Sequence, residues 1–310
     1  MKIAMTGWRA LGTSVHVLVS GAAALGPAAT AVDDTLRAVD LAYSRFRPDS
    51  ELATVNTHQG RPVAVSALFA DAVAASLRAA RESDGAVDPT VGRAMRVVGY
   101  DDDFPRLARS AGPLTLRVEP VPGWRSIRFD RESRTIALPP GVELDLGSTG
   151  KAFAADLAAA NAHRAMRGGA VLVSLGGDIA TAGDVPPDGW PVLVAEDSAM
   201  AADTDGEVIA LRGGAVATSS TTVRRWTRGS IELHHIIDPT TGLPARGPWR
   251  TATVVAGSCV DANTAATAAI VLGDAALKWL TRSKLPARLV SVAGTVTRIN
   301  DWPAPLELSA

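Results

Sequence analysis

The sequence predicts an α+β fold with mixed or antiparallel sheets and interspersed helices. Many strand-like segments occur, and helix-like segments fall among them irregularly, unlike the regular alternation of a doubly wound parallel sheet. An apolar fraction of 47% and a charged fraction of 20% are typical of a globular chain with a sizeable core. At 310 residues the chain is within reach of one large unit or two intimate lobes, and no linker separates independent domains. We therefore expect a single domain over residues 1–310.

Apolar periodicity and turn residues place the elements in the first half of the chain. Ser50 follows a turn and can cap a short helix, and Asp84-Gly85 is a helix stop signal. The predicted elements are a strand at 14–19, helices at 30–43, 51–56 and 66–82, strands at 125–129, 134–138 and 142–146, and an alanine-rich helix at 152–165.

The same signals place the elements of the second half. The continuous apolar run at 171–175 predicts a buried strand that stops at Gly176-Gly177-Asp178. Ser258 can be the N-cap of a helix at 261–272 that Gly273 ends. The other predicted elements are strands at 190–195, 206–211, 215–218, 235–239 and 251–255, and a closing hairpin of 287–292 with 295–299.

Charge and cysteine content exclude several classes of function. A formal net charge of −1 gives no basic face for nucleic acid. Cys259 is the only cysteine, so neither an intramolecular disulfide nor a cysteine-rich metal site can form. No strongly apolar stretch is long enough for a membrane span, and the N-terminal residues lack the apolar core of a signal peptide. The expected compartment is the cytoplasm.

The stretch L-D-L-G-S-T-G-K at 144–151 looks like a phosphate loop but fails as one. A nucleotide-triphosphate loop of the G-x-x-x-x-G-K-[ST] type needs glycine where Asp145 stands and Ser or Thr where Ala152 stands. A glycine-rich turn before a helix still directs backbone N–H groups and the helix dipole at a ligand, which favours an anion or a carbonyl-rich molecule. The alternative is a tight connection in which Asp145 is a solvated edge residue.

Two further glycine turns carry acids. S-D-G-A-V-D-P-T at 83–90 places two acids around a glycine, a pattern that is most often a plain turn. Gly176-Gly177-Asp178 follows a buried strand, at the end of a sheet where ligands bind and where glycines let a ligand approach the backbone. A simple bulge or turn explains that segment equally well.

His234-His235 and the helix after Ser258 carry side chains with chemical potential. Adjacent histidines on a strand face opposite sides, so only one can share a cleft with the neighbours of Asp238. That histidine is either a general acid or base, a phosphate contact, or a core residue making one hydrogen bond. Asn263 and Thr267 lie four residues apart on one helix face, where their oxygens suit Mg²⁺, although capping and small-residue packing also explain the segment.

Taken together and in order, these segments resemble the FAD:protein FMN transferases, the ApbE flavin transferase family. The resemblance runs from about residue 9 to residue 298. It is carried by A-L-G-T-S-V, Y-S-R-F-R-P-D-S-E-L-A-T-V-N, S-D-G-A-V-D-P-T-V-G, E-L-D-L-G-S-T-G-K-A-F-A-A-D, V-S-L-G-G-D-I, H-H-I-I-D-P-T-T-G and the helix from Asn263 to Gly273. Each motif alone is weak, and the seven in register are specific.

The resemblance implies a fold of two intimate lobes around a flavin cleft, and a Mg²⁺-dependent transfer reaction. A Thr or Ser hydroxyl of a flavin-acceptor protein would attack the FMN phosphorus of FAD, and AMP would leave. By position, the residues expected to line the FAD site are Tyr43, Ala86, Val87, Asp88, Gly147, Phe153 and Ile236, with Lys151 as a charge near the phosphates. The Gly150 carbonyl, Asn263 and Thr267 fall on the family's cation ligands, and His235 is the candidate base.

The chain departs from the family pattern at two of these positions. Phe153 stands where the family often has Tyr, and Asn263 stands where it commonly has Asp. An amide oxygen supplies no negative charge, and Asp261 lies roughly 200° around the helix from Asn263, so it cannot simply replace the missing acid. The metal is therefore weaker, or a neighbouring acid compensates, or flavin is bound without efficient transfer. Hydrolysis of FAD to FMN and AMP, and flavin binding with a weakened metal site, remain alternative functions.

Overall fold

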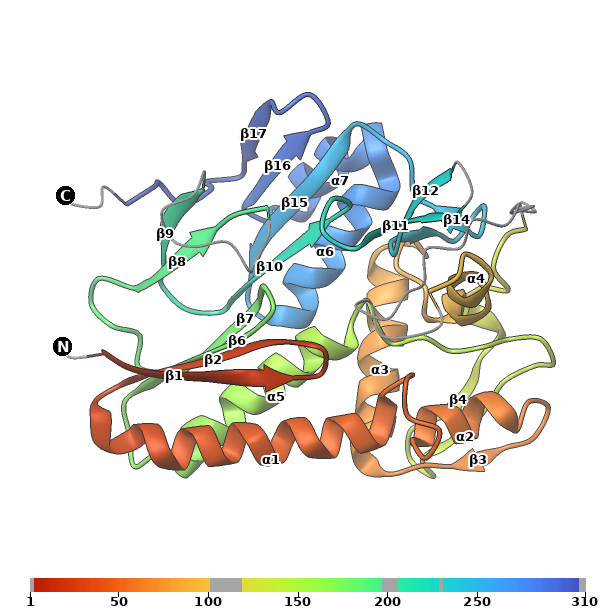
Figure 1. Cartoon of the computed structure of the whole chain (residues 1–310), viewed down its shortest axis with the longest axis horizontal. Coiled ribbons are helices and arrows are strands. Elements are labelled where there is room, and N and C mark those ends of the chain that lie inside the picture. The colour runs from red at the N-terminus through yellow and green to blue at the C-terminus, as the bar shows by residue number, and fades with distance from the viewer. Residues whose placement is uncertain (1–2, 101–118, 197–205, 229–230, 307–310) are drawn as a thin grey trace.

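An eight-stranded antiparallel sheet forms the centre of the computed structural model, which describes residues 3–100, 119–196, 206–228 and 231–306 (Figure 1). Every neighbouring pair of strands in it is antiparallel. In spatial order the strands are β1 (Ile3–Ala10), β2 (Thr13–Ser20), β6 (Ala170–Leu175), β7 (Asp178–Gly183), β10 (Ala215–Ser220), β15 (Trp249–Ala256), β16 (Ala287–Ser291) and β17 (Val296–Ile299). The predicted α+β class is confirmed.

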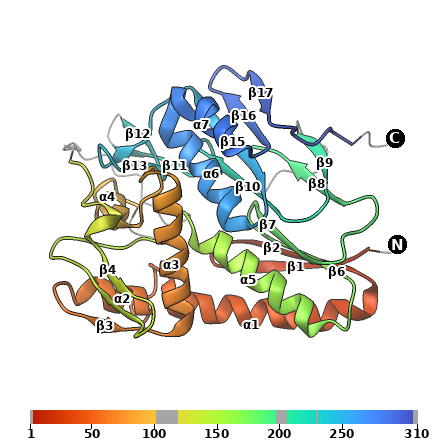
Figure 2. The ribbon, with the colours of Figure 1, turned by 180° about the vertical axis from the view of Figure 1, so that it is seen from behind.

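Three helices pack on one face of this sheet (Figure 2). They are α1 (Leu25–Tyr43), α5 (Gly150–Ala165) and α6 (Cys259–Leu272). Helix α5 lies against β6 and β7, α6 lies against β10 and β15, and α1 packs on α5 and β2. The buried faces of α5 and α6 consist largely of alanine. Because alanine side chains are short, these helices approach the strands closely and hold their polar side chains near the sheet.

The opposite face of the sheet is covered by a hairpin of β8 (Trp190–Val194) and β9 (Glu207–Leu211). Trp190 and Ile209 are fully buried and pack with Leu172 and Val216 of the sheet. In β8, inward and outward residues alternate, as expected for a strand with one buried face.

A smaller group of elements lies beyond the C-terminal end of α1 (Figure 1). It comprises α2 (Glu51–Thr57), α3 (Ala67–Glu82), α4 (Gly92–Val97), the sheet of β3 (Val63–Ala64), β5 (Thr135–Ala137) and β4 (Arg128–Asp130), and the pairs β11 (Arg225–Arg228) with β12 (Ile231–His234) and β13 (Ile237–Asp238) with β14 (Leu243–Pro244). Helix α7 (Ala276–Ser283) follows α6 and packs against it. None of the helices in the described ranges combines the length and apolar character needed to cross a bilayer.

The predicted helix caps are present, and three helices start earlier than predicted, α5 and α6 by two residues and α1 by five. Ser50 Oγ accepts a hydrogen bond from Ala53 N at 3.1 Å, and Ser258 Oγ accepts one from Asp261 N at 3.2 Å. The helix predicted at 30–43 begins at Leu25. Pro27 does not prevent this, because it falls in the first turn, where backbone N–H groups make no hydrogen bond within the helix.

Two predicted strands are wrong. Residues 142–146 form no strand, because the Asn56 side chain takes the place of a neighbouring strand: its Nδ2 donates to Leu144 O at 2.9 Å and its Oδ1 accepts from Leu144 N at 2.8 Å. Of the strand predicted at 235–239, only Ile237 and Asp238 form a strand, β13, because β12 has already ended at His234. His235 therefore lies in a bend between two short strands, not within one.

Candidate active site

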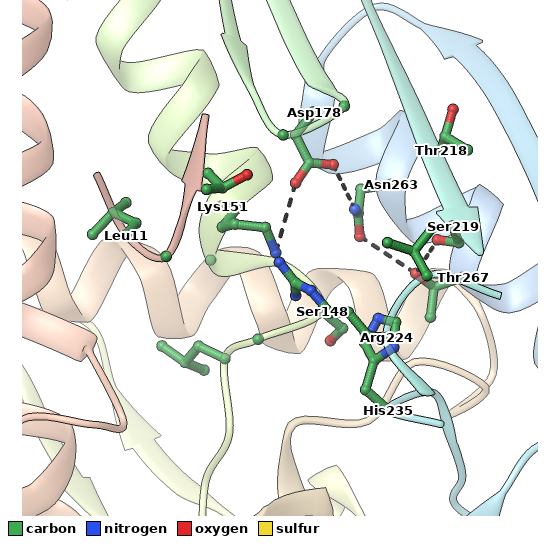
Figure 3. A pocket seen from close by; sticks show the side chains of 18 of the residues that line it. Leu11, Ser148, Lys151, Asp178, Thr218, Ser219, Arg224, His235, Asn263 and Thr267 are labelled. Carbon is green, nitrogen blue, oxygen red and sulfur yellow. Dashed lines mark hydrogen bonds and ion pairs between the residues drawn. The ribbon is translucent and has the colours of Figure 1, made fainter. Parts of the chain in front are cut away.

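A cavity of about 1000 Å³ lies where the helix-covered sheet meets the smaller group of elements. Its walls come from segments that are far apart in the sequence (Figure 3). They include the end of α1, the turn before α5, the β6–β7 turn, β10, the segment between β12 and β13, and the inner face of α6. Predicted site residues that line it are Tyr43, Ala86, Val87, Asp88, Gly147, Gly150, Lys151, His235, Ile236, Asn263 and Thr267.

The turn before α5 is held by two buried side chains. Tyr43 OH donates to Gly150 O at 3.0 Å, and a Cβ on Gly150 would lie 3.0 Å from the Tyr43 ring, so glycine lets this ring approach. Burial raises the pKa of Tyr43 well above the usual phenol range, so the hydroxyl stays protonated and remains a donor. Asp145 is buried and accepts from Arg45 Nη1 and from Gly147 N, each at 2.6 Å. The reading of Asp145 as a solvated edge residue is therefore wrong.

A chain of polar contacts crosses the cavity wall from α5 to β10 (Figure 3). Lys151 Nζ lies 4.0 Å from Asp178 Oδ2, and Asp178 Oδ1 accepts from Asn263 Nδ2 at 2.8 Å. Thr267 Oγ1 donates to Asn263 Oδ1 at 3.4 Å, and the Ser219 and Thr267 hydroxyls are 2.8 Å apart. Asn263 and Thr267 thus share one helix face, as predicted.

Burial dominates the titration of the two charged members of this chain. The pKa of Lys151 is lowered, chiefly by desolvation and then by the neighbouring Arg224 cation. The pKa of Asp178 is raised by desolvation, with Lys151 and Asn263 opposing that shift. Each charge therefore depends on its neighbours for stabilisation, and a bound ligand would change that balance.

The β6–β7 turn sets the position of Asp178. Gly176 has φ 61°, and a Cβ there would lie 1.9 Å from Thr13 Oγ1, so no other residue fits without movement. Asp178 is the first residue of β7 and only 4% exposed. The turn and the ligand-site interpretations of this segment are thus compatible, because a tight glycine turn delivers an acid to the cavity.

His235 has a buried imidazole whose charged form is disfavoured. Its side chain lines the cavity, and its Nδ1 is buried without a hydrogen-bond partner in the described part of the chain. Burial, followed by Arg224 and Lys151, lowers the pKa of His235 well below 6.5. His234 instead places Nε2 2.9 Å from Ala245 O. Of the two histidines, only His235 lines this cavity.

Comparison with known proteins identifies the family of this chain. The model of the ApbE family matches residues 11–289. The chain belongs to the ApbE family. The FAD:protein FMN transferase of Haemophilus influenzae is 25% identical, over 93% of this chain and 86% of that protein. The enzyme of the same name from Treponema pallidum is 30% identical over 77% and 69%. The crystal structure of the ApbE protein from Thermotoga maritima superposes with a TM-score of 0.82 at 26% identity, covering 96% of this chain and 97% of that one.

Phe153 is the predicted flavin residue that this ApbE-family structure does not bring to the cavity. It packs instead against the main core. The reason is helical geometry: Phe153 lies two residues after Lys151 and so roughly 200° around α5. Asp88 does border the cavity, but its carboxylate accepts from Thr90 N and Trp124 N, each at 2.8 Å, and so also holds the surrounding loops.

The cavity could hold a hard divalent cation on oxygen ligands. The Gly150 carbonyl, Asn263 Oδ1 and Thr267 Oγ1 are all oxygens, which is the ligand chemistry that Mg²⁺ prefers. No cluster of three or more histidine, cysteine or acidic side chains suited to a metal occurs within the described residues. A cation here would therefore rest on neutral oxygens, with Asp178 as the adjoining negative charge.

Sequence reasoning missed two contributors to the cavity, Arg224 and Arg45. Arg224 is half-buried, points toward Lys151 and has no carboxylate partner among the residues that the structure describes (Figure 3). Arg45 pairs with Asp145 and lies with its Cζ 4.2 Å from the centre of the Tyr100 ring. No local signal marks these residues, because each lies in an irregular segment and gains its role from distant partners.

Proposed function

We propose that this chain is one transferase domain that moves FMN from FAD to a Thr or Ser hydroxyl of an acceptor protein, with Mg²⁺, and releases AMP. The observation that carries the proposal is the meeting of a neutral histidine, a cationic pair and an oxygen-lined helix face in one cavity. Membership of the ApbE family supports it, since relatives of this chain are named FAD:protein FMN transferase. The cavity volume of about 1000 Å³ is at the upper end of ordinary ligand sites and suits a dinucleotide flavin.

His235 would act as the general base. Its lowered pKa keeps the ring neutral near pH 7, so a ring nitrogen can take the proton of the acceptor hydroxyl. The hydroxyl oxygen then forms a bond to the FMN phosphorus. The bond from that phosphorus to the bridging oxygen breaks, and the bridging oxygen leaves with AMP. FMN remains esterified to the acceptor.

Cationic side chains would stabilise the charge that develops on the phosphoryl oxygens. Lys151 and Arg224 both extend into the cavity, and both lie near the carboxylate of Asp178 (Figure 3). Their surplus positive charge favours a diphosphate between them and His235. When bound, Mg²⁺ would neutralise phosphate charge, and Gly150, Asn263 and Thr267 are the residues that would hold it. Tyr43, Ala86, Val87, Asp88, Gly147 and Ile236 would line the rest of the FAD site.

One incubation tests the proposal. The full chain is mixed with FAD, MgCl₂ and a flavin-acceptor domain, and the acceptor mass and free AMP are measured. We expect the acceptor to gain one FMN for each AMP released, and an acceptor with valine at its target position to gain none. AMP with an unmodified acceptor would make the protein an FAD hydrolase. Bound FAD without AMP at any Mg²⁺ concentration would make it a flavin-binding protein, and either result would overturn the transferase proposal.

A further inference from the structure

We propose that Asp178 is a positioning residue for the cation site: it orients the Asn263 amide and supplies, from β7, the negative charge that the cation-binding face of α6 lacks. The inference rests on the proposed function, because it concerns the cation proposed there. It identifies the acid that compensates for an amide at position 263. Asp261 on the same helix does not, since it is partly exposed and pairs with Arg78.

The hydrogen bond between the two side chains determines which atom of the amide faces Thr267. An ionised carboxylate can only accept, so Asp178 Oδ1 selects the NH₂ group of Asn263, at 2.8 Å. The amide oxygen is thereby turned to Thr267 Oγ1, 3.4 Å away, where two oxygen atoms can meet one cation (Figure 3). If the amide flipped, its NH₂ group would face the cation and repel it.

Both partners of this hydrogen bond are held rigidly. Asp178 is 4% exposed and follows the Gly176-Gly177 turn, which has no room for a side chain at Gly176. Asn263 is 8% exposed on the face of α6 that packs against the sheet. Because a strand and a helix of the core carry the pair, its geometry does not depend on a mobile loop.

The negative charge of Asp178 is not fully neutralised by neighbouring cations. Its nearest cation, Lys151, is 4.0 Å away, longer than a direct hydrogen bond, and Lys151 itself faces Arg224. A carboxylate bonded to a ligand's far side strengthens that ligand's hold on a metal, and removing such a partner typically costs about 10- to 100-fold in metal affinity. We expect a loss of that size when Asp178 loses its charge.

An exchange of the two residues gives the sharpest test. Asn263→Asp alone would place two buried carboxylates in contact, which lowers the thermal stability of the metal-free protein. The double variant Asp178→Asn/Asn263→Asp restores one carboxylate and one amide, with the donor now on β7. Because the double variant keeps the hydrogen bond, it should fold even where a single variant does not.

Binding of Mn²⁺, a spectroscopic substitute for Mg²⁺, is measured by electron paramagnetic resonance on the full chain, free and loaded with ADP, which cannot donate FMN. We expect Asp178→Asn to weaken Mn²⁺ binding by about 10- to 100-fold, the double variant to bind at least as tightly as wild type, and the control Asp261→Asn to bind as wild type. Unchanged Mn²⁺ affinity in a folded Asp178→Asn, or an equal loss in Asp261→Asn, would overturn this inference and leave FMN transfer untouched. If the wild-type protein bound no Mn²⁺, both this inference and the proposed cation requirement would be wrong. The transfer assay measures the cation requirement separately, by varying MgCl₂.

Discussion

The ion pair between Arg45 and Asp145 joins the segment after α1 to the turn before α5. Arg45 Nη1 lies 2.6 Å from Asp145 Oδ2, and the two side chains are 18% and 6% exposed. Asp145 also accepts from Gly147 N, and Arg45 also donates to Tyr100 O. Replacing Asp145 by asparagine keeps the size of the side chain, but removes the charge and turns an NH₂ group toward the guanidinium.

The magnitude follows from the burial of the pair. Removing one partner of a buried ion pair costs about 3–5 kcal/mol. Arg45 retains its bond to Tyr100 O and its contacts with the Tyr100 and Phe46 rings, and it is partly solvated, so we expect a loss of about 2–3 kcal/mol. With an unfolding entropy of about 2.1 cal/mol/K per residue, that loss lowers the Tm by roughly 3–5 °C for a chain of this length.

Thermal unfolding followed by circular dichroism measures this effect. Asp49→Asn is the matched control, because Asp49 forms a well-exposed ion pair with Arg47 in the same segment and its loss should leave the Tm unchanged. A double variant with Arg45→Met should recover part of the loss, since the unpaired guanidinium is then absent. Equal Tm values for Asp145→Asn and Asp49→Asn would show that the Arg45–Asp145 pair does not stabilise the fold.

Three other predictions concern the cavity. The pKa of His235 lies well below 6.5, so the acid limb of kcat/KM for FMN transfer should fall below pH 6.5, and an acid limb at or above 6.5 would argue against His235 as the base. The free energy of unfolding should also decline as the pH drops below 6.5, because only the unfolded histidine takes up a proton there. Gly176→Ala should lower the free energy of unfolding in urea by at least about 1–3 kcal/mol, because φ at Gly176 is 61° and Thr13 blocks a Cβ there. Gly257→Ala is the control, because the space around Gly257 is open, and it should leave the free energy of unfolding unchanged. Arg224→Gln should weaken FAD binding roughly 10-fold in calorimetry and leave riboflavin binding unchanged, since only FAD carries a diphosphate; an equal loss for both ligands would assign Arg224 to the flavin ring.

Local chemistry explains why much of the element order could be predicted. Ser50 and Ser258 satisfy N–H groups within three residues of themselves, so their caps are visible in the sequence. The strand predicted at 142–146 failed because a strand needs a partner, and the partner of Leu144 is a side chain from position 56. The apolar run predicted a strand there, but it carries no signal for the Asn56 side chain that satisfies the backbone of Leu144.

The sequence by itself determined the α+β class, the helix caps, the shared helix face of Asn263 and Thr267, and the motif order that resembles the ApbE family. Each of these depends on neighbours a few residues away or on residue types in series. Only the tertiary structure decided that Phe153 packs against the core, that Arg224 faces Lys151, and that Asp178 binds the amide of Asn263. Asp178 and Asn263 lie 85 residues apart in the chain. They meet because the alanine-lined α6 packs against the sheet beside the start of β7, a contact set by the packing of the whole core rather than by either local segment.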